Sequence, residues 1–307
     1  MTRRRLLQAL AGLGATLAVA PAYGIGIEAN LAPKVVSYDV CPPGWPDALA
    51  LNIAIVADLH ACKPWMDQER IAHIVKRTNA IGADLILLLG DYVASHRFIT
   101  GRLEPAEWAE PLQDLRAPLG VHAVLGNHDW WQDEKVLLTG KGPPAAKGGL
   151  EAVGIPVYEN EAVRITKDGA AFWLAGLGDQ LAYWMTRKRP RNSRGGADDL
   201  PATLKQITDD APVILMAHDP DIIMHVPDRV ALTLSGHTHG GQVRVFGWPP
   251  VVPSRYGRRF AYGHICEPRD IVVSGGLGCS GVPLRFGMPP EIVLVRVRGA
   301  RPTVSAV

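Results

Sequence analysis

Residues 51–60 read LNIAIVADLH, an apolar run rich in β-branched residues that leads directly into Asp58 and His60. Such a run is typical of a buried β-strand. Four later runs lead in the same way into Asp, Asn or His: DLILLLGD (84–91), VHAVLGNHD (121–129), VILMAH (213–218) and ALTLSGHTH (231–239). Open α/β sheets build their sites at the carboxyl ends of their strands. The five runs therefore predict an α/β protein whose polar strand ends meet at one edge.

The polar residues at these strand ends suit two metal ions better than one. Asp58 and His60 are two residues apart, as are His237 and His239, so on extended backbone both members of a pair project to the same side. The candidate oxygen and imidazole ligands number seven: Asp58, His60, Asp91, Asn127, His218, His237 and His239. If Asp91 bridges through both carboxylate oxygens, each ion receives four protein ligands. Two carboxylates leave positive charge on two divalent ions, which favours a phosphate ester.

The motifs, in this order, resemble the calcineurin-like metallophosphoesterase superfamily over roughly residues 50–298. The resemblance implies a four-layer α-β-β-α sandwich with two mixed β-sheets. It also implies one metal held by Asp58, His60, Asp91 and His239, and a second held by Asp91, Asn127, His218 and His237. The strings LSGHTHGGQVR (234–244) and GLGCSGVPLRFGMPPEIVLV (276–295) are similar to a narrower branch, the exported bacterial YkuE-like and YaeI-like phosphoesterases.

The chemistry implied is metal-dependent hydrolysis of a phosphoric ester, with a phosphodiester as the favoured substrate. A hydroxide between the metals would attack phosphorus, and His128 would protonate the leaving oxygen as general acid. Asp129 is the candidate for orienting the His128 ring, although His128 is also open to a purely structural role. Mixed nitrogen and oxygen ligands suit Mn, Fe or Zn as the two ions.

Four further residues are candidates for contacts with substrate. Trp130 and Trp131 follow the GNHD motif directly, so they suit a wall for an apolar or ring-bearing group, with core packing as the alternative. Arg244 and Arg285 are candidate phosphate clamps, and either is equally open to pairing with a surface carboxylate.

Two other functions compete with the phosphodiesterase. One is a lipid-precursor diphosphatase of the UDP-diacylglucosamine type, for which a basic loop and tryptophans would bind the lipid. The other is a catalytically inert metal-binding scaffold. The intact ligand set and His128 argue against the scaffold, and export of the domain argues against a cytoplasmic lipid precursor.

The amino-terminal residues 1–22 resemble a twin-arginine export signal, because TRRRLLQ (2–8) precedes a mildly apolar stretch. Cleavage after Ala22 is the favoured outcome, and an uncleaved membrane anchor is the alternative. We therefore expect the twin-arginine export machinery as a partner. The expected location is the periplasm, or the outer side of the inner membrane.

Residues 23–48 are predicted to form a linker or an edge extension, and residues 49–300 the metallophosphoesterase domain. The net charge of +2 includes Arg3, Arg4 and Arg5 of the leader. Without these three, 29 basic residues remain against 30 acidic ones, which gives a net charge of −1. No nucleic-acid partner is expected.

The basic run RKRPR (187–191), after Tyr183 and Trp184, is interpreted as a solvated loop, or as a contact with anionic lipid at a membrane surface.

Periodicity predicts a helix over residues 66–80 and a weaker one over 103–115, interrupted at Pro111. A third helix is expected at 200–207. Short strands are predicted at 155–160, 162–166 and 171–177, and the later runs at 213–217, 231–235, 270–274 and 291–298 suggest a second sheet. Four cysteines lie at positions 41, 62, 266 and 279. Cys266 and Cys279 are a possible pair, and free thiols are the favoured state.

Overall fold

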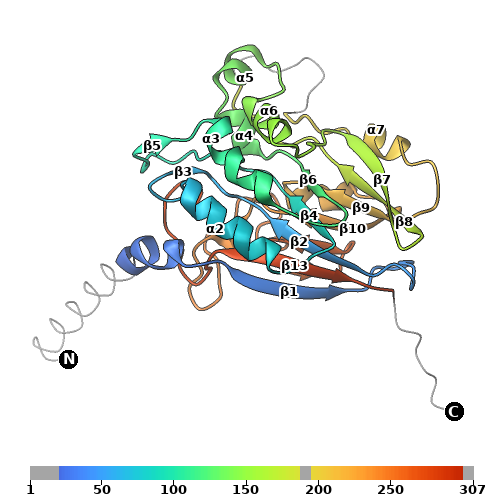
Figure 1. Ribbon diagram of the computed structural model, residues 1–307. Helices are drawn as coiled ribbons and strands as arrows, with labels where there is room; N and C mark the ends of the chain where they lie inside the picture. Colours follow the sequence, from blue (N-terminus) through green and yellow to red (C-terminus); the bar gives the residue numbers. More distant parts are fainter. Residues whose placement is uncertain (1–20, 187–194, 300–307) are drawn as a thin grey trace, which may run out of the picture.

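The computed structural model describes residues 21–186 and 195–299 (Figure 1). The twin-arginine string and the basic run that begins at Arg187 lie outside the described residues. All four cysteines are free thiols; Cys62 and Cys279 are buried, whereas Cys41 and Cys266 are exposed.

Five strands form the first sheet, in the order β1-β13-β2-β4-β6. Their bounds are Lys34–Val40 (β1), Leu51–Val56 (β2), Leu85–Leu88 (β4), Val121–Ala123 (β6) and Glu291–Val297 (β13). The sheet is mixed because β13 runs antiparallel to β2, whereas the other neighbours are parallel. The prediction that residues 291–298 belong to the second sheet is therefore wrong. An apolar run predicts a buried strand but does not specify its neighbours, and this strand lies between β1 and β2.

Six strands form the second sheet, in the order β11-β12-β10-β9-β8-β7. Their bounds are Glu161–Lys167 (β7), Ala170–Gly176 (β8), Val213–Met216 (β9), Val230–Ser235 (β10), Gly263–Ile265 (β11) and Ile271–Val273 (β12). A small third sheet pairs β3 (Cys62–Lys63) with β5 (Gly101–Arg102). The strand predicted at 155–160 is reduced to one bridge between Ala123 and Val157.

The two large sheets pack face to face, as the alternation of side chains along β2 and β4 shows. Ile55 and Leu87 point into a buried cluster shared with Leu234 of the second sheet. The neighbouring Val56 and Leu88 point to the opposite face, where they pack beneath the helices. Because successive strand residues face opposite sides, strands buried on both faces are continuously apolar, as these sequences are.

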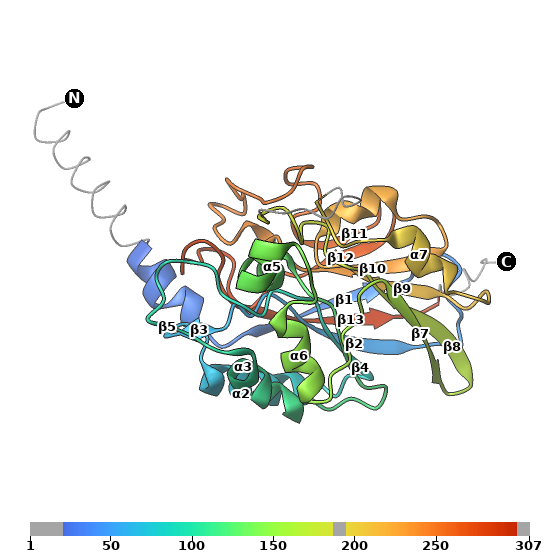
Figure 2. The same cartoon turned by 90° about the horizontal axis from the view of Figure 1, so that it is seen from above.

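Helices cover both outer faces of this pair of sheets (Figure 2). Over the first sheet lie α2 (Gln68–Asn79), α3 (Pro105–Ala109), η2 (Glu110–Asp114) and α6 (Ala145–Ala152), and over the second lie α7 (Leu200–Lys205) and η3 (Pro220–His225). Asp67 caps α2 by accepting a hydrogen bond from the Arg70 amide at 3.0 Å. The predicted four-layer α-β-β-α sandwich with two mixed sheets is confirmed.

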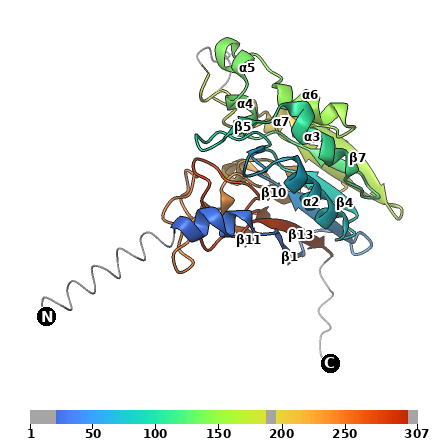
Figure 3. The same cartoon turned by 60° about the vertical axis from the view of Figure 1, so that its left-hand side comes forward.

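The remaining short elements surround the edge where the polar strand ends meet. They are η1 (Glu28–Asn30), α4 (Asn127–Trp131), α5 (Glu134–Thr139) and η4 (His239–Gly241). Since β2, β4 and β6 are mutually parallel, as are β9 and β10, their carboxyl ends present the predicted polar side chains together. In another view, residues 21–30 lie beside the orange and red loops that follow β10 and β12 (Figure 3).

Candidate metal centre

Two clusters of buried ligand atoms lie at this edge. The ligand atoms of Asp58, His60 and His239 are within 4.8 Å of one another, and so are those of Asp91, His218 and His237. The last predicted ligand, Asn127, joins the second cluster, because its Oδ1 lies 2.8 Å from Nδ1 of His237. All seven predicted ligands are thus brought together.

Asp91 lies between the two clusters. Its Oδ2 is 3.6 Å from Nε2 of His60 in one cluster and 3.2 Å from Nε2 of His218 in the other. Its Oδ1 accepts a hydrogen bond from the His128 amide at 2.8 Å. This is the position required of a carboxylate that bridges two ions.

Main-chain carbonyls orient two of the imidazoles. Nδ1 of His60 lies 3.1 Å from the Val93 carbonyl oxygen, and Nδ1 of His218 lies 2.6 Å from that of Leu89. A carbonyl only accepts, so each Nδ1 carries a proton, and each Nε2 is turned toward the Asp91 carboxylate. Hydrogen bonds of this kind fix both the tautomer and the ring orientation of metal-binding histidines.

Five of the seven ligand residues have a left-handed backbone that ordinary side chains avoid. Their φ angles are 56° for Asp58, 48° for His60, 58° for Asp91, 70° for His237 and 52° for His239. Such a conformation costs about 1–2 kcal/mol per residue. It persists here because neighbouring strand ends bond to one another, with the Asp58 amide donating to the Gly90 carbonyl at 3.0 Å and the His60 amide to that of Asp91 at 2.9 Å.

Glycines give these ligands the space that they need. A Cβ on Gly126 would collide with the Asp91 carboxylate and would lie 2.7 Å from Cε1 of His218. A Cβ on Gly236 would lie 2.7 Å from Oδ2 of Asp58. The Gly-Asn and Gly-His dipeptides of the sequence therefore allow the two clusters to lie so close together.

The electrostatics of the site fit bound cations. Within the described part of the chain, Oδ2 of Asp58 is buried without a hydrogen-bond partner, and Nε2 of His218 faces the Asp91 carboxylate at 3.2 Å. Burial, together with the negative charge of Asp91 nearby, raises the pKa of Asp58 to about 7. Burial also lowers the pKa of His60 to about 3 and that of His239 well below its usual value, so both imidazoles are neutral and ready to bind metal. A positive ion among these groups would satisfy all of them.

Comparison with known proteins identifies this arrangement. The family model described as calcineurin-like phosphoesterase matches residues 51–241, which include all seven ligands. The chain belongs to the calcineurin-like phosphoesterase family. Membership of this family assigns the chain to the metal-dependent phosphoester hydrolases.

The relatives span several lineages. The phosphoesterase is 27% identical to the metallophosphoesterase YkuE of Bacillus subtilis, over 97% of this chain and 98% of YkuE. It is 29% identical to a metallophosphoesterase of Helicobacter pylori, over 96% of this chain and 72% of that one. It is 27% identical to a zebrafish (Danio rerio) transmembrane protein with a metallophosphoesterase domain, over 92% of this chain and 61% of that protein.

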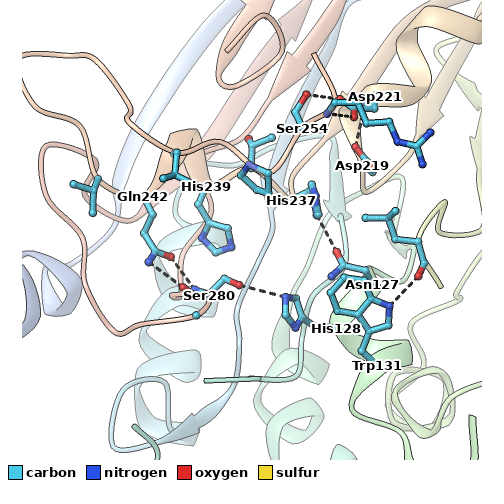
Figure 4. A pocket seen from close by; sticks show the side chains of 18 of the residues that line it. Asn127, His128, Trp131, Asp219, Asp221, His237, His239, Gln242, Ser254 and Ser280 are labelled. Atoms are coloured by element: carbon cyan, nitrogen blue, oxygen red, sulfur yellow. Dashed lines mark hydrogen bonds between the residues drawn. The ribbon is translucent and has the colours of Figure 1, made fainter. Parts of the chain in front are cut away.

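His128 of the phosphoesterase faces the metal centre from the start of α4. Its ring centroid is 5.0 Å from that of His60 and 5.3 Å from that of Trp131. Its Nε2 lies 3.2 Å from the hydroxyl of Ser280, and its Nδ1 is buried without a partner among the described residues (Figure 4). Burial lowers the pKa of His128, and a phosphate anion in the site would raise it again.

The predicted partner of the His128 ring, Asp129, has a different position. Its carboxylate accepts hydrogen bonds from the main-chain amides of Asp91, Tyr92, Val93 and Gly126, at 2.8–3.2 Å. Asp129 therefore holds the bridging Asp91 in place and does not orient His128. The hydroxyl beside the ring belongs to Ser280. The string 276–295 supported only the family resemblance, so no role for this residue was predicted from the sequence. Gln242 fixes that loop, since its side chain bonds both the amide and the carbonyl of Ser280.

The predicted substrate contacts of three residues also need correction. Arg285 is fully buried, and its guanidinium donates to the carbonyls of Gly275, Gly278 and Met288. It packs beside His239, where it supports the site from behind. Arg244 lies over the Tyr262 ring at 4.9 Å and does not line the pocket. Trp130 is buried against Tyr183, because the helical turn of α4 sends adjacent residues in different directions.

A pocket of about 860 Å³ opens beside the metal centre. His128, Asn127, His237 and His239 lie on its inner wall, and Trp131 lies nearby (Figure 4). Its remaining wall is mostly apolar: Leu181, Trp184, Val243, Pro250, Val251, Pro253 and Val282. The indole of Trp131 donates to the Leu181 carbonyl at 2.8 Å, which fixes its orientation. The tryptophan that suits a substrate wall is therefore Trp131.

Replacing Ser280 by Ala tests the contact with His128. We expect a rate loss of about two- to tenfold, the value of one hydrogen bond of roughly 0.5–1.5 kcal/mol, with metal content unchanged. Steady-state kinetics and elemental analysis measure the two quantities. Ser274→Ala serves as a control, since Ser274 is buried in the loop after β12 and does not line the pocket. A Ser280→Ala enzyme with undiminished turnover would show that the hydroxyl does not position the ring.

Proposed function

We propose that this phosphoesterase hydrolyses a phosphodiester that carries an apolar group, and that it does so outside the cytoplasm. The observation that supports the substrate is the position of a largely apolar pocket directly against the seven-ligand centre. Trp131 and Val251 line this pocket and are available to contact an ester substituent. Apolar walls with a few convergent polar groups are what a small-molecule site of this kind requires.

Asp58, His60, Asp91 and His239 would hold one ion, and Asp91, Asn127, His218 and His237 the other. Mn, Fe and Zn all suit such nitrogen and oxygen ligands. Bound ions supply charge to stabilise the phosphoryl oxygens and lower the pKa of water. The protein's own residues perform the remaining work: Asn127 and the histidines keep the centre positive, and His128 delivers a proton to the leaving oxygen.

The charge of the pocket favours a diester over a monoester. Among the described residues that line the pocket, Arg255 is the single permanent cation, whereas Asp219 and Asp221 contribute two carboxyl groups. A diester carries one negative charge and a monoester nearly two, so the monoester would need more cations than the pocket provides. The apolar wall also suits a lipid-linked diphosphate, which is our second candidate.

Replacing Trp131 by Ala tests the apolar wall. We expect kcat/KM for a diester with a long acyl or alkyl group to fall by roughly tenfold or more, because the ring's apolar contact is lost. The kcat/KM for a small methyl aryl diester should fall much less. Trp131→Phe should retain most of the wild-type preference for the long-chain diester. The screen uses metal-reconstituted protein with phospholipids, nucleotide-linked lipid diphosphates and cyclic nucleotides. Turnover of none of these by protein that holds both metals would favour the inert scaffold.

The proposed location rests on the TRRRLLQ string and is tested separately. Changing Arg3 and Arg4 to Lys, and then all of Arg3, Arg4 and Arg5, should leave active enzyme inside the cell. Immunoblots of cell fractions measure delivery, and activity of the retained protein shows that it folded. Normal delivery of the triple variant would refute twin-arginine dependence. Among the described residues, no helix is long and apolar enough to cross a membrane.

A further inference from the structure

We propose that residues 243–259, here called the docking loop, bind the surface of an anionic lipid bilayer. The docking loop connects η4 to β11 and reads VRVFGWPPVVPSRYGRR. The inference deepens the proposed function, on which its substrate part rests: a diester held in a bilayer would reach the pocket along this loop.

The tip of the docking loop exposes large apolar side chains. The exposed fraction is 105% for Phe246, 72% for Val251 and 50% for Trp248. Exposed apolar residues are ordinary when they are scattered, but three within six positions on one protruding loop are not. Aromatic residues of this kind are enriched where proteins meet the lipid–water interface.

The tip is a tight hairpin whose sequence does not suit its turn. Val245 and Trp248 exchange two main-chain hydrogen bonds, at 2.9 and 3.0 Å, around Phe246 and Gly247. Both central residues have positive φ, 51° for Phe246 and 80° for Gly247. Asn, Asp or Gly is the usual residue at the first of these positions, and Phe is strained there. Packing within the folded chain does not explain a strained and fully exposed Phe, which favours a role in binding.

The charge of the docking loop is uniformly positive. It contains four arginines, Arg244, Arg255, Arg258 and Arg259, and no Asp or Glu. In the part of the chain that the structure describes, none of the four has a carboxylate within 4.0 Å of its guanidinium nitrogens. Arg258 lies over the Trp248 ring at 5.3 Å, which joins the charge to the apolar tip. Basic side chains beside aromatic ones suit anionic headgroups above acyl chains.

The docking loop is also continuous with the pocket. Pro250, Val251 and Pro253 form part of the pocket wall. The carboxylate of Asp221 fixes this section by accepting hydrogen bonds from the Ser254 hydroxyl at 2.6 Å and the Arg255 amide at 2.7 Å. The docking loop is therefore anchored at the mouth of the pocket, so docking of its tip would bring the pocket close to the membrane.

A second apolar segment borders the docking loop. The Arg244 amide donates to the Phe286 carbonyl at 2.6 Å, and the Phe286 ring contacts that of Tyr23. Tyr23 belongs to residues 21–31, whose ribbon lies beside these loops (Figure 3). Ile27 in this segment is 54% exposed. A narrow aromatic tip flanked by unpaired arginines fits a bilayer better than a second protein, whose core contacts are usually broad and depleted of charge.

The test is co-sedimentation of the full chain with vesicles of phosphatidylcholine alone, or of phosphatidylcholine with phosphatidylglycerol. We expect binding to the anionic vesicles, weakened by salt. The double variant Phe246→Ser with Trp248→Ser should bind at least tenfold more weakly, and Arg255, Arg258 and Arg259 changed together to Gln should lose the preference for anionic lipid. Phe98→Ser is the matched control, since Phe98 is 59% exposed outside the docking loop. All proteins share residues 1–20, so any lipid affinity of that segment is common to them.

Insertion of the tip is measured directly with an environment-sensitive fluorophore on Phe246→Cys, after Cys41 and Cys266 have been changed to Ser. We expect a blue shift with anionic vesicles and none when the fluorophore is placed at residue 98.

Hydrolysis of a soluble aryl phosphodiester should be unchanged in the Phe246/Trp248 variant, because neither residue lines the pocket. This measurement separates docking from the proposed chemistry. Equal sedimentation of that variant and wild type, an unshifted fluorophore, or a dimer that dissociates in the variant would each overturn bilayer docking.

Discussion

Asp91→Asn is expected to release both metal ions together and to abolish turnover. Asp91 places one carboxylate oxygen between the two clusters, since its Oδ2 lies 3.6 Å from Nε2 of His60 and 3.2 Å from Nε2 of His218. The amide removes the negative charge that would compensate both ions, and an amide oxygen is a weaker bridging ligand than a carboxylate oxygen, so both ions are held less tightly. The fold should survive, because Asn tolerates the left-handed backbone at this position, where φ is 58°.

Elemental analysis of the purified variant measures this outcome, with circular dichroism to confirm folding. Asp58→Asn is the matched comparison, since Asp58 belongs to one cluster. It should weaken one ion far more than the other. Fully active wild type with a single ion per chain would contradict the two-ion site, and so would an Asp91→Asn protein that retains two.

His128→Ala is expected to keep both ions and lose roughly 10²–10⁴ in rate, about 3–5 kcal/mol of barrier. His128 is not needed for either ligand cluster, and its ring faces Ser280 and the pocket. The loss should depend on the leaving group. Nitrophenolate leaves without a proton, whereas an alkoxide requires one, so the alkyl diester should suffer much more than the nitrophenyl diester.

Kinetics on matched alkyl and nitrophenyl diesters, together with metal analysis, decide the role of His128. The more conservative His128→Gln keeps a polar side chain without an acid, so it should resemble the Ala variant on the alkyl ester. Equal losses on the two esters with unchanged metal would assign His128 to orienting the phosphate.

The ligands could be predicted from sequence because each follows an apolar run that is typical of a buried strand. Parallel strands bring their carboxyl ends to the same edge of a sheet. Helix α2 was equally predictable, since Ile71, Ile74 and Val75 recur on one face and Asp67 caps it. The partner of β13 was not, because its apolar pattern fits the interior of either sheet. Nor were the positions of Arg285 and Trp130, because sequence reports polarity and spacing but not which carbonyls or rings surround a side chain.

The two ion positions each draw ligands from both sheets. Asp58 and His60 follow β2 whereas His239 follows β10, and Asp91 follows β4 whereas His218 follows β9. An ion can stay bound only while the sheets keep their spacing, so its dissociation and the opening of the sandwich are thermodynamically linked. The apolar cluster between the sheets, which includes Ile55 and Leu234, therefore contributes to metal retention although it provides no ligand. Conversely, a bound ion would add to the stability of the packed sheets.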